Sequence, residues 1–182
     1  MKSGVTVRAD NTQAIFDALR AISKKDVLVG IPAEDSQRED VPFGNAGIGY
    51  INEKGSPAQN IPARPHLKPG VQSVQSQTIE KLKAAAVATL EGNAAAADRA
   101  LNSAGIIAAQ GVKRYMTITG FTPLAESTLS ARARRGRKGA AKELASRAAG
   151  NAADNANARP LIDEGQYRRA ITYVVRDKNA KS

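Results

Sequence analysis

The chain has 182 residues, a net charge of +10 and no cysteine, which excludes disulfide frameworks and thiolate zinc sites. Hydrophobic residues make up 42% of it but are largely alanine, and aromatic residues make up 4%, so a thin core stabilised by neighbouring subunits is expected. No run approaches the roughly 18 apolar residues of a membrane span, and no signal peptide is expected. The charge favours phosphate, an anionic membrane or an acidic protein as partner.

The first part of the chain predicts two short strands around one helix. Residues 5–10 alternate as a strand does, and residues 26–32 form a β-branched run that ends at a proline. Between them, Asp10 or Asn11 can cap a helix whose apolar residues recur at helical spacing. This apolar stripe consists of Ile15, Phe16, Leu19 and Ile22.

Two segments then lead to the middle of the chain. Residues 33–45 are polar and typical of a loop or a hairpin tip. Four acidic side chains crowd this segment and are expected to be solvated: Glu34, Asp35, Glu39 and Asp40. Residues 46–55 fit either a short helix that stops at Gly55 or a strand.

Residues 56–70, called the proline strap below, hold Pro57, Pro62, Pro65 and Pro69. Each proline fixes its own φ, lacks a backbone donor and pushes the preceding residue toward an extended conformation. The strap is therefore expected to be stiff and unpaired, neither helix nor inner strand. Arg64 and His66 flank Pro65 within it.

Two helices are predicted after the strap. Residues 71–92 and 94–120 both show helical periodicity, with a break at Gly92-Asn93 and a stop at Gly120. The stripes are Ile79, Leu82, Ala86 and Leu90 in the first helix, and Leu101, Gly105, Ala108, Val112 and Tyr115 in the second. Such narrow, alanine-rich stripes indicate close packing against a neighbour.

The last third changes character. Residues 131–159 are rich in Ala, Arg and Asn and have almost no large apolar side chain, so they are expected to form a mobile or partner-ordered basic arm. Structure is expected to resume over 160–177 and to end in a frayed tail at 178–182. In the closing strand, Ile171, Tyr173 and Val175 alternate with Thr172, Val174 and Arg176.

Few residues suggest catalysis. His66 is the only histidine, and a surface or interface position is favoured for it over a catalytic one. No cluster of His, Cys, Asp or Glu has metal-ligand spacing. Gly44, Gly47 and Gly49 stand in the wrong order for a dinucleotide fingerprint, and residues 134–142 lack the phosphate-loop pattern. The sequence therefore predicts that the protein is not an enzyme. No catalytic residue, bound metal or cofactor is expected.

The feature that remains is the charge of the basic arm. Six of its cations are candidates for contact with DNA or a partner: Arg132, Arg134, Arg135, Arg137, Lys138 and Lys142. A phosphate-binding segment and a merely solvated charge run both stay open. Because no aromatic residue lies among the arginines, any nucleic-acid contact is expected to be to backbone phosphates and insensitive to sequence.

Several segments, taken in order, resemble the virion-morphogenesis proteins of tailed phages, the small neck or tail-completion proteins. They are VLVGIP at 27–32, GYINEKGSPAQNIPARPHLKPGV at 49–71, FTPLAESTLSARARRG at 121–136 and PLIDEGQYRRAITYVV at 160–175. The match covers most of the chain, and Ile-Pro-Ala-Arg-Pro is its most specific part. Lys54 and His66 stand where the family usually has aromatics, and Glu164 where a small residue is usual. The histidine weakens the expectation that the strap buries a large anchor.

The residues predict a long central helical region and the flexible basic arm, so one domain is expected over 1–130 and 160–177, with 131–159 as arm or insertion. The resemblance implies an α+β fold, with a small β-sheet flanked by helices, and does not settle the role of the arm. It also implies a structural virion protein without catalysis, a tail-completion or head–tail joining subunit that forms a ring in the neck between head connector and tail.

The partners implied are further copies of the chain, head-side connector proteins and the tail terminator or tail tube, with no membrane. Duplex genomic DNA in the lumen is a further candidate partner. The expected place is the virion neck, after assembly in the host cytoplasm. Pro62, Arg64, Pro65 and His66 are expected at the ring interface, since prolines reduce the entropy lost on docking. The alternative is that the strap only leads into the long helix.

Two other classes stay open. A basic accessory protein that binds duplex DNA without sequence specificity would bind it as an isolated monomer. A neck protein would bind weakly alone and gain affinity through ring multivalency. A hydrolase or nuclease is disfavoured by the single histidine and the missing metal cluster.

Overall fold

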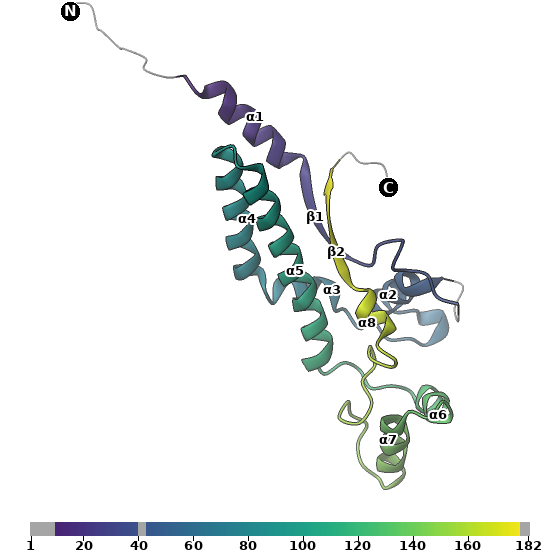
Figure 1. The fold of residues 1–182 in the computed structure, drawn as a ribbon. Coiled ribbons are helices and arrows are strands. Elements are labelled where there is room, and N and C mark those ends of the chain that lie inside the picture. Colours follow the sequence, from purple (N-terminus) through teal and green to yellow (C-terminus); the bar gives the residue numbers. More distant parts are fainter. Residues whose placement is uncertain (1–9, 40–42, 179–182) are drawn as a thin grey trace, which may run out of the picture.

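The computed structural model describes residues 10–39 and 43–178. The molecule is elongated, with two long helices as its spine, a two-stranded sheet beside them and a helical hairpin at the end far from the N-terminus (Figure 1). This arrangement confirms the α+β fold with helices flanking a small sheet. The strand expected at 5–10 and the tail expected at 178–182 lie almost wholly outside the described residues.

The sheet joins strands from opposite ends of the chain. β1 (Lys25–Gly30) pairs antiparallel with β2 (Thr172–Asp177), which confirms both strand predictions. In this register Leu28 lies opposite Val174, and both side chains are exposed on the outer face. The inner face lies against the spine.

The spine consists of α4 (Gln75–Leu90) and α5 (Ala94–Ile118), which break at Gly92 and Asn93 as predicted. The Asn93 side chain accepts a hydrogen bond from the Ala96 N–H at 3.0 Å and so caps α5. The buried positions of both helices are mostly small: Ala85 and Ala88 in α4, and Ala97, Ala104 and Ala108 in α5. The close packing that the alanine pattern indicated thus occurs within one chain.

The middle of α5 supports the sheet and the main core. The Tyr173 ring covers Gly105 so closely that a Cβ there would lie 2.1 Å from the ring. The buried residues of the main core are Val112, Met116, Leu161, Tyr167 and Ile171. Ile171 and Tyr173 therefore both face inward, as predicted for the closing strand.

Three short helices surround the main core: α2 (Gly44–Lys54), α3 (Leu67–Gln72) and α8 (Gln166–Ala170). Residues 46–55 are thus helical, and α2 ends at Gly55, whose φ of 77° favours glycine. The expectation that the proline strap contains no helix is wrong at both ends. A 3₁₀ turn, η1 (Pro57–Gln59), opens it, and α3 takes up its last residues, because prolines fit the first turn of a helix.

The expectation of a mobile or partner-ordered arm over 131–159 is also wrong. This part of the chain contributes to two helices, α6 (Glu126–Arg134) and α7 (Lys138–Ala148), joined at Gly136 with a φ of 81°. The hairpin has a small core of its own, built from Leu124, Leu129, Ala140 and Ala158. Buried polar groups complete this core, and composition alone does not reveal them.

The first helix, α1 (Thr12–Ser23), forms as predicted, and the Asp10 carboxylate accepts a hydrogen bond from the Thr12 N–H at 2.9 Å. It extends the molecule beyond the spine and contacts α4 and β1 (Figure 1). None of its residues is buried.

Candidate functional site

The proline strap is tied to the end of α2 by its backbone. The Arg64 N–H donates to the Asn52 carbonyl at 2.6 Å. The N–H groups of His66 and Leu67 donate to one carboxylate oxygen of Glu53, at 2.8 and 3.1 Å. These bonds fix the extended residues of the strap and the first residue of α3 in one orientation.

The four predicted interface residues divide between the interior and the surface. Arg64 and His66 are buried on one side of the extended backbone, with Pro65 exposed between them, and Pro62 is exposed as well. The expected interface positions of Arg64 and His66 are therefore wrong, because both are covered by the chain's own residues. Only the two prolines are open to a neighbouring molecule.

His66 is the centre of a buried polar cluster. Its Nδ1 lies 2.8 Å from the Arg64 carbonyl and 3.2 Å from the Glu53 carboxylate, and its Nε2 is hydrogen-bonded to the Tyr167 hydroxyl. Burial lowers the pKa of His66 and raises that of Tyr167. The neutral imidazole thus donates a hydrogen bond from Nδ1 to the Arg64 carbonyl. Its Nε2 accepts a hydrogen bond from the Tyr167 hydroxyl. Contrary to the sequence expectation, the strap does bury a large anchor.

Arg64 ties the strap to the connection between α5 and α6. Its Nε donates to the Thr122 carbonyl at 3.1 Å and its Nη2 to the Pro123 carbonyl at 3.4 Å. Burial, and then the positive charge of Arg132, lower the pKa of Arg64. These contacts within the chain hold the entry to the α6–α7 hairpin.

Arg132 holds the exit of the same hairpin. Its guanidinium donates to the carbonyls of Arg159, Pro160 and Ile162 at 2.9, 3.0 and 3.1 Å, and its Nε lies 3.5 Å from the Asp163 carboxylate. Burial lowers the pKa of Arg132. Because the side chain is buried and fully engaged, the predicted role of Arg132 in contacting DNA or a partner is wrong. Arg64 and Arg132 are called the arginine clasp below.

Two further predicted contact residues are paired at the surface. Arg135 lies 2.7 Å and Arg137 3.1 Å from the Asp163 carboxylate, and Arg137 also pairs with Glu164. Such exposed pairs contribute modestly to stability, typically about 0–1 kcal/mol. They neutralise much of the charge that the sequence offers at these two positions.

Glu143 is buried in the hairpin and organises its interior. Its carboxylate accepts hydrogen bonds from Arg147 Nε at 2.9 Å, Asn157 Nδ2 at 3.1 Å and the Asp154 N–H at 3.3 Å. The bond from Asn157 is the main cause that lowers the pKa of Glu143. This network ties α7 to the loop that follows it.

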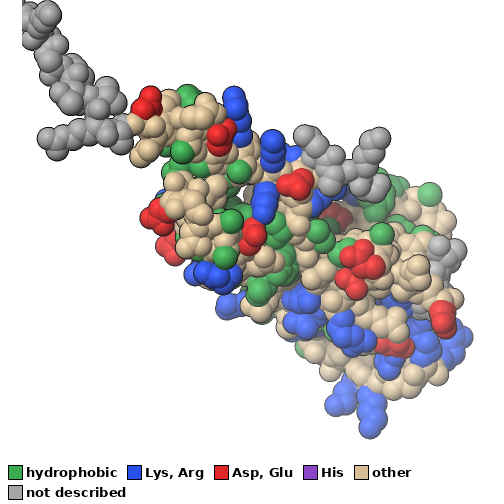
Figure 2. Space-filling view, turned by 45° about the horizontal axis from the view of Figure 1, so that its top comes forward, with side chains coloured by type: hydrophobic (Ala, Val, Ile, Leu, Met, Phe, Trp, Pro, Cys, Tyr) green, Lys and Arg blue, Asp and Glu red, His purple; other side chains and the backbone are tan. Residues whose placement is uncertain are grey.

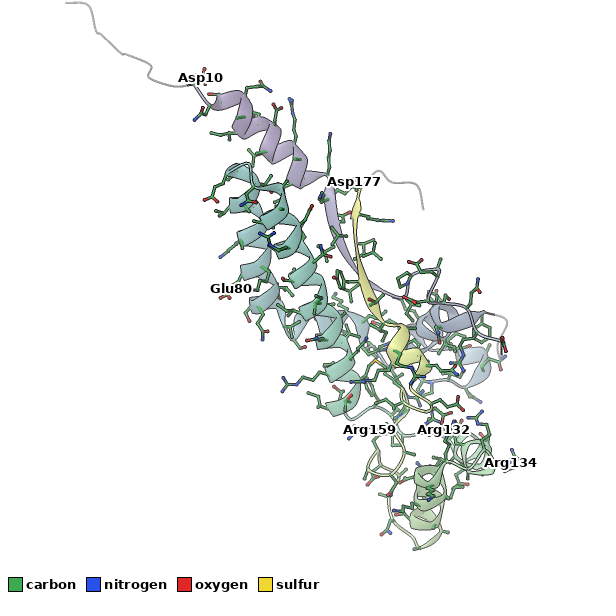
Figure 3. The ribbon with its side chains drawn as sticks, viewed as in Figure 1. Asp10, Glu80, Arg132, Arg134, Arg159 and Asp177 are labelled. Atoms are coloured by element: carbon green, nitrogen blue, oxygen red, sulfur yellow. The ribbon has the colours of Figure 1, made fainter. Side chains whose placement is uncertain are left out.

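Three of the six predicted contact residues are free. Arg134, Lys138 and Lys142 are exposed, and none has an ionic partner among residues 10–39 and 43–178. Arg134 projects away from the hairpin (Figure 3). These three are called the basic patch below.

A different kind of surface lies at the other end of the molecule. Large hydrophobic side chains of α1 and α4 are exposed there: Ile15, Phe16, Leu19, Ile79, Leu82, Val87 and Leu90. Hydrophobic side chains are visible along this end, while Lys and Arg gather toward the hairpin (Figure 2). The stripe predicted to pack in α4 is thus open, because Thr78, Ala85 and Ala88 face the core in its place. We call these seven residues the apolar end surface.

A cleft of about 500 Å³ lies beside the arginine clasp, lined among others by Pro62, Arg64, Arg132, Asp163 and Tyr167. The charged and phenolic side chains named here are all engaged within the chain, by backbone carbonyls, by ion pairs or by His66. Within the described ranges, no three His, Asp or Glu side chains are placed to hold a metal ion. Nor do these ranges contain a helix long and apolar enough to cross a membrane.

Four residues of these networks were not singled out from the sequence in their observed roles: Glu53, Glu143, Asp163 and Tyr167. Tyr167 carried one weak signal, as an aromatic residue in the closing motif of a chain with few aromatics. Comparison with known proteins found no matching family model, no matching curated protein and no matching solved structure.

Proposed function

We propose that the protein is a structural subunit of the neck of a tailed phage, a tail-completion or head–tail joining protein that assembles as a ring between head connector and tail. The observation that carries this proposal is the apolar end surface, since large apolar side chains exposed together on two neighbouring helices indicate an interaction site. The resemblance in the strap and the closing motif supports a place for this assembly in the virion neck.

The size of the apolar end surface fits an assembly that needs several contacts. Its seven side chains are between 40% and 54% exposed, so covering each would contribute about 1 kcal/mol, roughly half of full burial. The sum of about 7 kcal/mol is comparable with the roughly 4–15 kcal/mol that association costs. One pairwise contact is therefore weak, and the isolated chain is expected to be monomeric or loosely associated.

The two helices that make up this surface would allow copies to assemble head to tail. If α1 of one copy covers α4 of the next, the contact is heterologous, and a closing rotation turns it into a ring. Each copy then uses both helices, and neck partners supply further contacts. The proline strap, bound by the arginine clasp, keeps each subunit rigid and is not the main contact.

The proposal is tested by a joining assay. Cells infected with a phage that lacks this gene should accumulate filled heads and finished tails, and purified wild-type chain should join them. A Phe16→Ser/Leu82→Ser protein should fold but fail to join, because both side chains are exposed in the single chain. A Lys24→Gln/Lys81→Gln protein, also altered at exposed positions, should join normally. Full joining by the serine variant would exclude the apolar end surface.

A further inference from the structure

We propose that the α6–α7 hairpin binds the phosphate backbone of duplex DNA through the basic patch, without preference for base sequence. This proposal does not depend on the ring, because the hairpin is part of the single chain. It assigns a function to the α6–α7 hairpin, which is not part of the apolar end surface.

Charge is concentrated in the hairpin. Residues 126–159 hold eight Lys or Arg and three Asp or Glu, a net charge of +5, which is half of the +10 of the whole chain. Four of these cations are engaged inside the chain: Arg132, Arg135, Arg137 and Arg147. Of the other four, Arg159 is half-buried beside Arg132, and the three exposed cations are those of the basic patch, which have no ionic partner in the described ranges.

The fold holds these cations in place before any ligand arrives. Lys138 and Lys142 lie one turn apart on α7, which puts their Cβ atoms about 5–6 Å apart on one face. Duplex DNA carries one charge per roughly 1.7 Å of its axis, so each side chain can meet a separate phosphate. Because the hairpin is fixed by Glu143 and the arginine clasp, little backbone entropy is lost on binding.

The direction of α7 adds to the same potential. Lys138 is its first residue, its first turn holds no acidic residue, and no side chain caps it. The positive end of the helix dipole is therefore not neutralised within that turn and reinforces the field at Lys138.

The hairpin surface favours DNA over an acidic protein. Among the described residues between 121 and 159, no large hydrophobic side chain is exposed. Stable protein interfaces have an apolar or aromatic centre, whereas contacts to the DNA backbone are polar and positively charged. A surface that offers charge alone thus fits phosphate better.

The test uses the full chain and a fluorescein-labelled duplex of mixed sequence, with binding followed by anisotropy as salt is raised. The variant is Arg134→Gln/Lys138→Gln/Lys142→Gln. The matched control, Lys24→Gln/Lys54→Gln/Lys81→Gln, removes the same charge at exposed positions between α1 and β1, on α2 and on α4. Circular dichroism melting curves should be the same for all three proteins.

The patch variant should lose about 0.9 in the log–log salt slope for each lost phosphate contact, up to about 2.7 in total, and about eightfold in affinity per contact at 0.1 M salt. The control should keep the wild-type slope, and AT-rich and GC-rich duplexes should be affected alike. Equal losses in patch variant and control, or no binding by wild type at low salt, would overturn the proposal. If polyglutamate displaces the DNA at equal charge concentration, the basic patch binds an acidic protein and the DNA proposal is wrong.

Discussion

Replacing Glu143 by glutamine should release the α6–α7 hairpin while the spine stays folded. The carboxylate is 1% exposed and accepts bonds from Arg147, Asn157 and the Asp154 backbone. Glutamine keeps one acceptor oxygen and leaves Arg147 without its charged partner. Hydrogen bonds to charged groups contribute about 1.5–3 kcal/mol each, and breaking a buried ion pair costs about 3–5 kcal/mol. We expect a loss of about 3 kcal/mol.

That loss is large for this hairpin. Its core contains two buried large apolar side chains, Leu124 and Leu129, whose burial contributes about 3–6 kcal/mol together, and a partly buried Leu144 packs against them. The core around Val112 and Ile171 is separate. The free energy lost should therefore appear as local opening of the hairpin before global unfolding.

Hydrogen exchange followed by mass spectrometry measures this directly. In Glu143→Gln, amides of α7 should exchange about 100-fold faster, since about 1.4 kcal/mol corresponds to a factor of ten. Amides of α5 should keep their wild-type rates. The matched control is Glu126→Gln, at an exposed position in the first turn of α6, which should change exchange little. Unchanged protection of α7 in Glu143→Gln would refute the claim that this carboxylate orders the hairpin.

Three further predictions concern the main body. Arg64→Ala should lower the free energy of unfolding by about 2–3 kcal/mol, because it removes the bonds to the Thr122 and Pro123 carbonyls. Arg64→Lys should restore only part of this free energy, because an ammonium lacks the fork geometry of a guanidinium. An unchanged denaturant midpoint in Arg64→Ala would contradict this prediction. Ile171→Asp puts a carboxylate at a fully buried position and should abolish cooperative thermal unfolding, so a soluble variant with a sharp transition would count against the core assignment. Because burial lowers the pKa of His66, the unfolded chain binds a proton that the folded chain does not, and stability in urea titrations should fall as pH drops below about 6.5. His66→Gln should remove this fall in stability at low pH. If the fall persists in the variant, another titrating group causes it.

The periodicity of apolar residues in the sequence predicted much of the secondary structure correctly. The strand at 26–32, the two spine helices and the closing strand are all present where their patterns placed them, because apolar spacing reports directly on helix and strand geometry. The ambiguity over 46–55 was genuine, since Gly55 ends the segment in either case. Which face of α4 would pack was predicted wrongly, because alanines let α5 approach closely and left Leu82 outside.

The polar interior could not be read from spacing. Arg64 meets Thr122, and His66 meets Tyr167, across 58 and 101 residues of sequence. A side chain that bonds distant carbonyls looks the same in sequence as one exposed to solvent. The ordered hairpin was missed for the same reason, since Glu143 replaces much of the apolar burial that composition measures.

The central claim is that copies of this chain cover one another's apolar end surface in a ring. A cryo-electron microscopy reconstruction of the neck of purified particles tests it most directly. We predict a closed ring of this chain in which α1 of each copy lies on α4 of the next, with Phe16 and Leu82 covered. A particle neck that lacks the chain, or a ring in which these side chains stay open to solvent, would contradict the account.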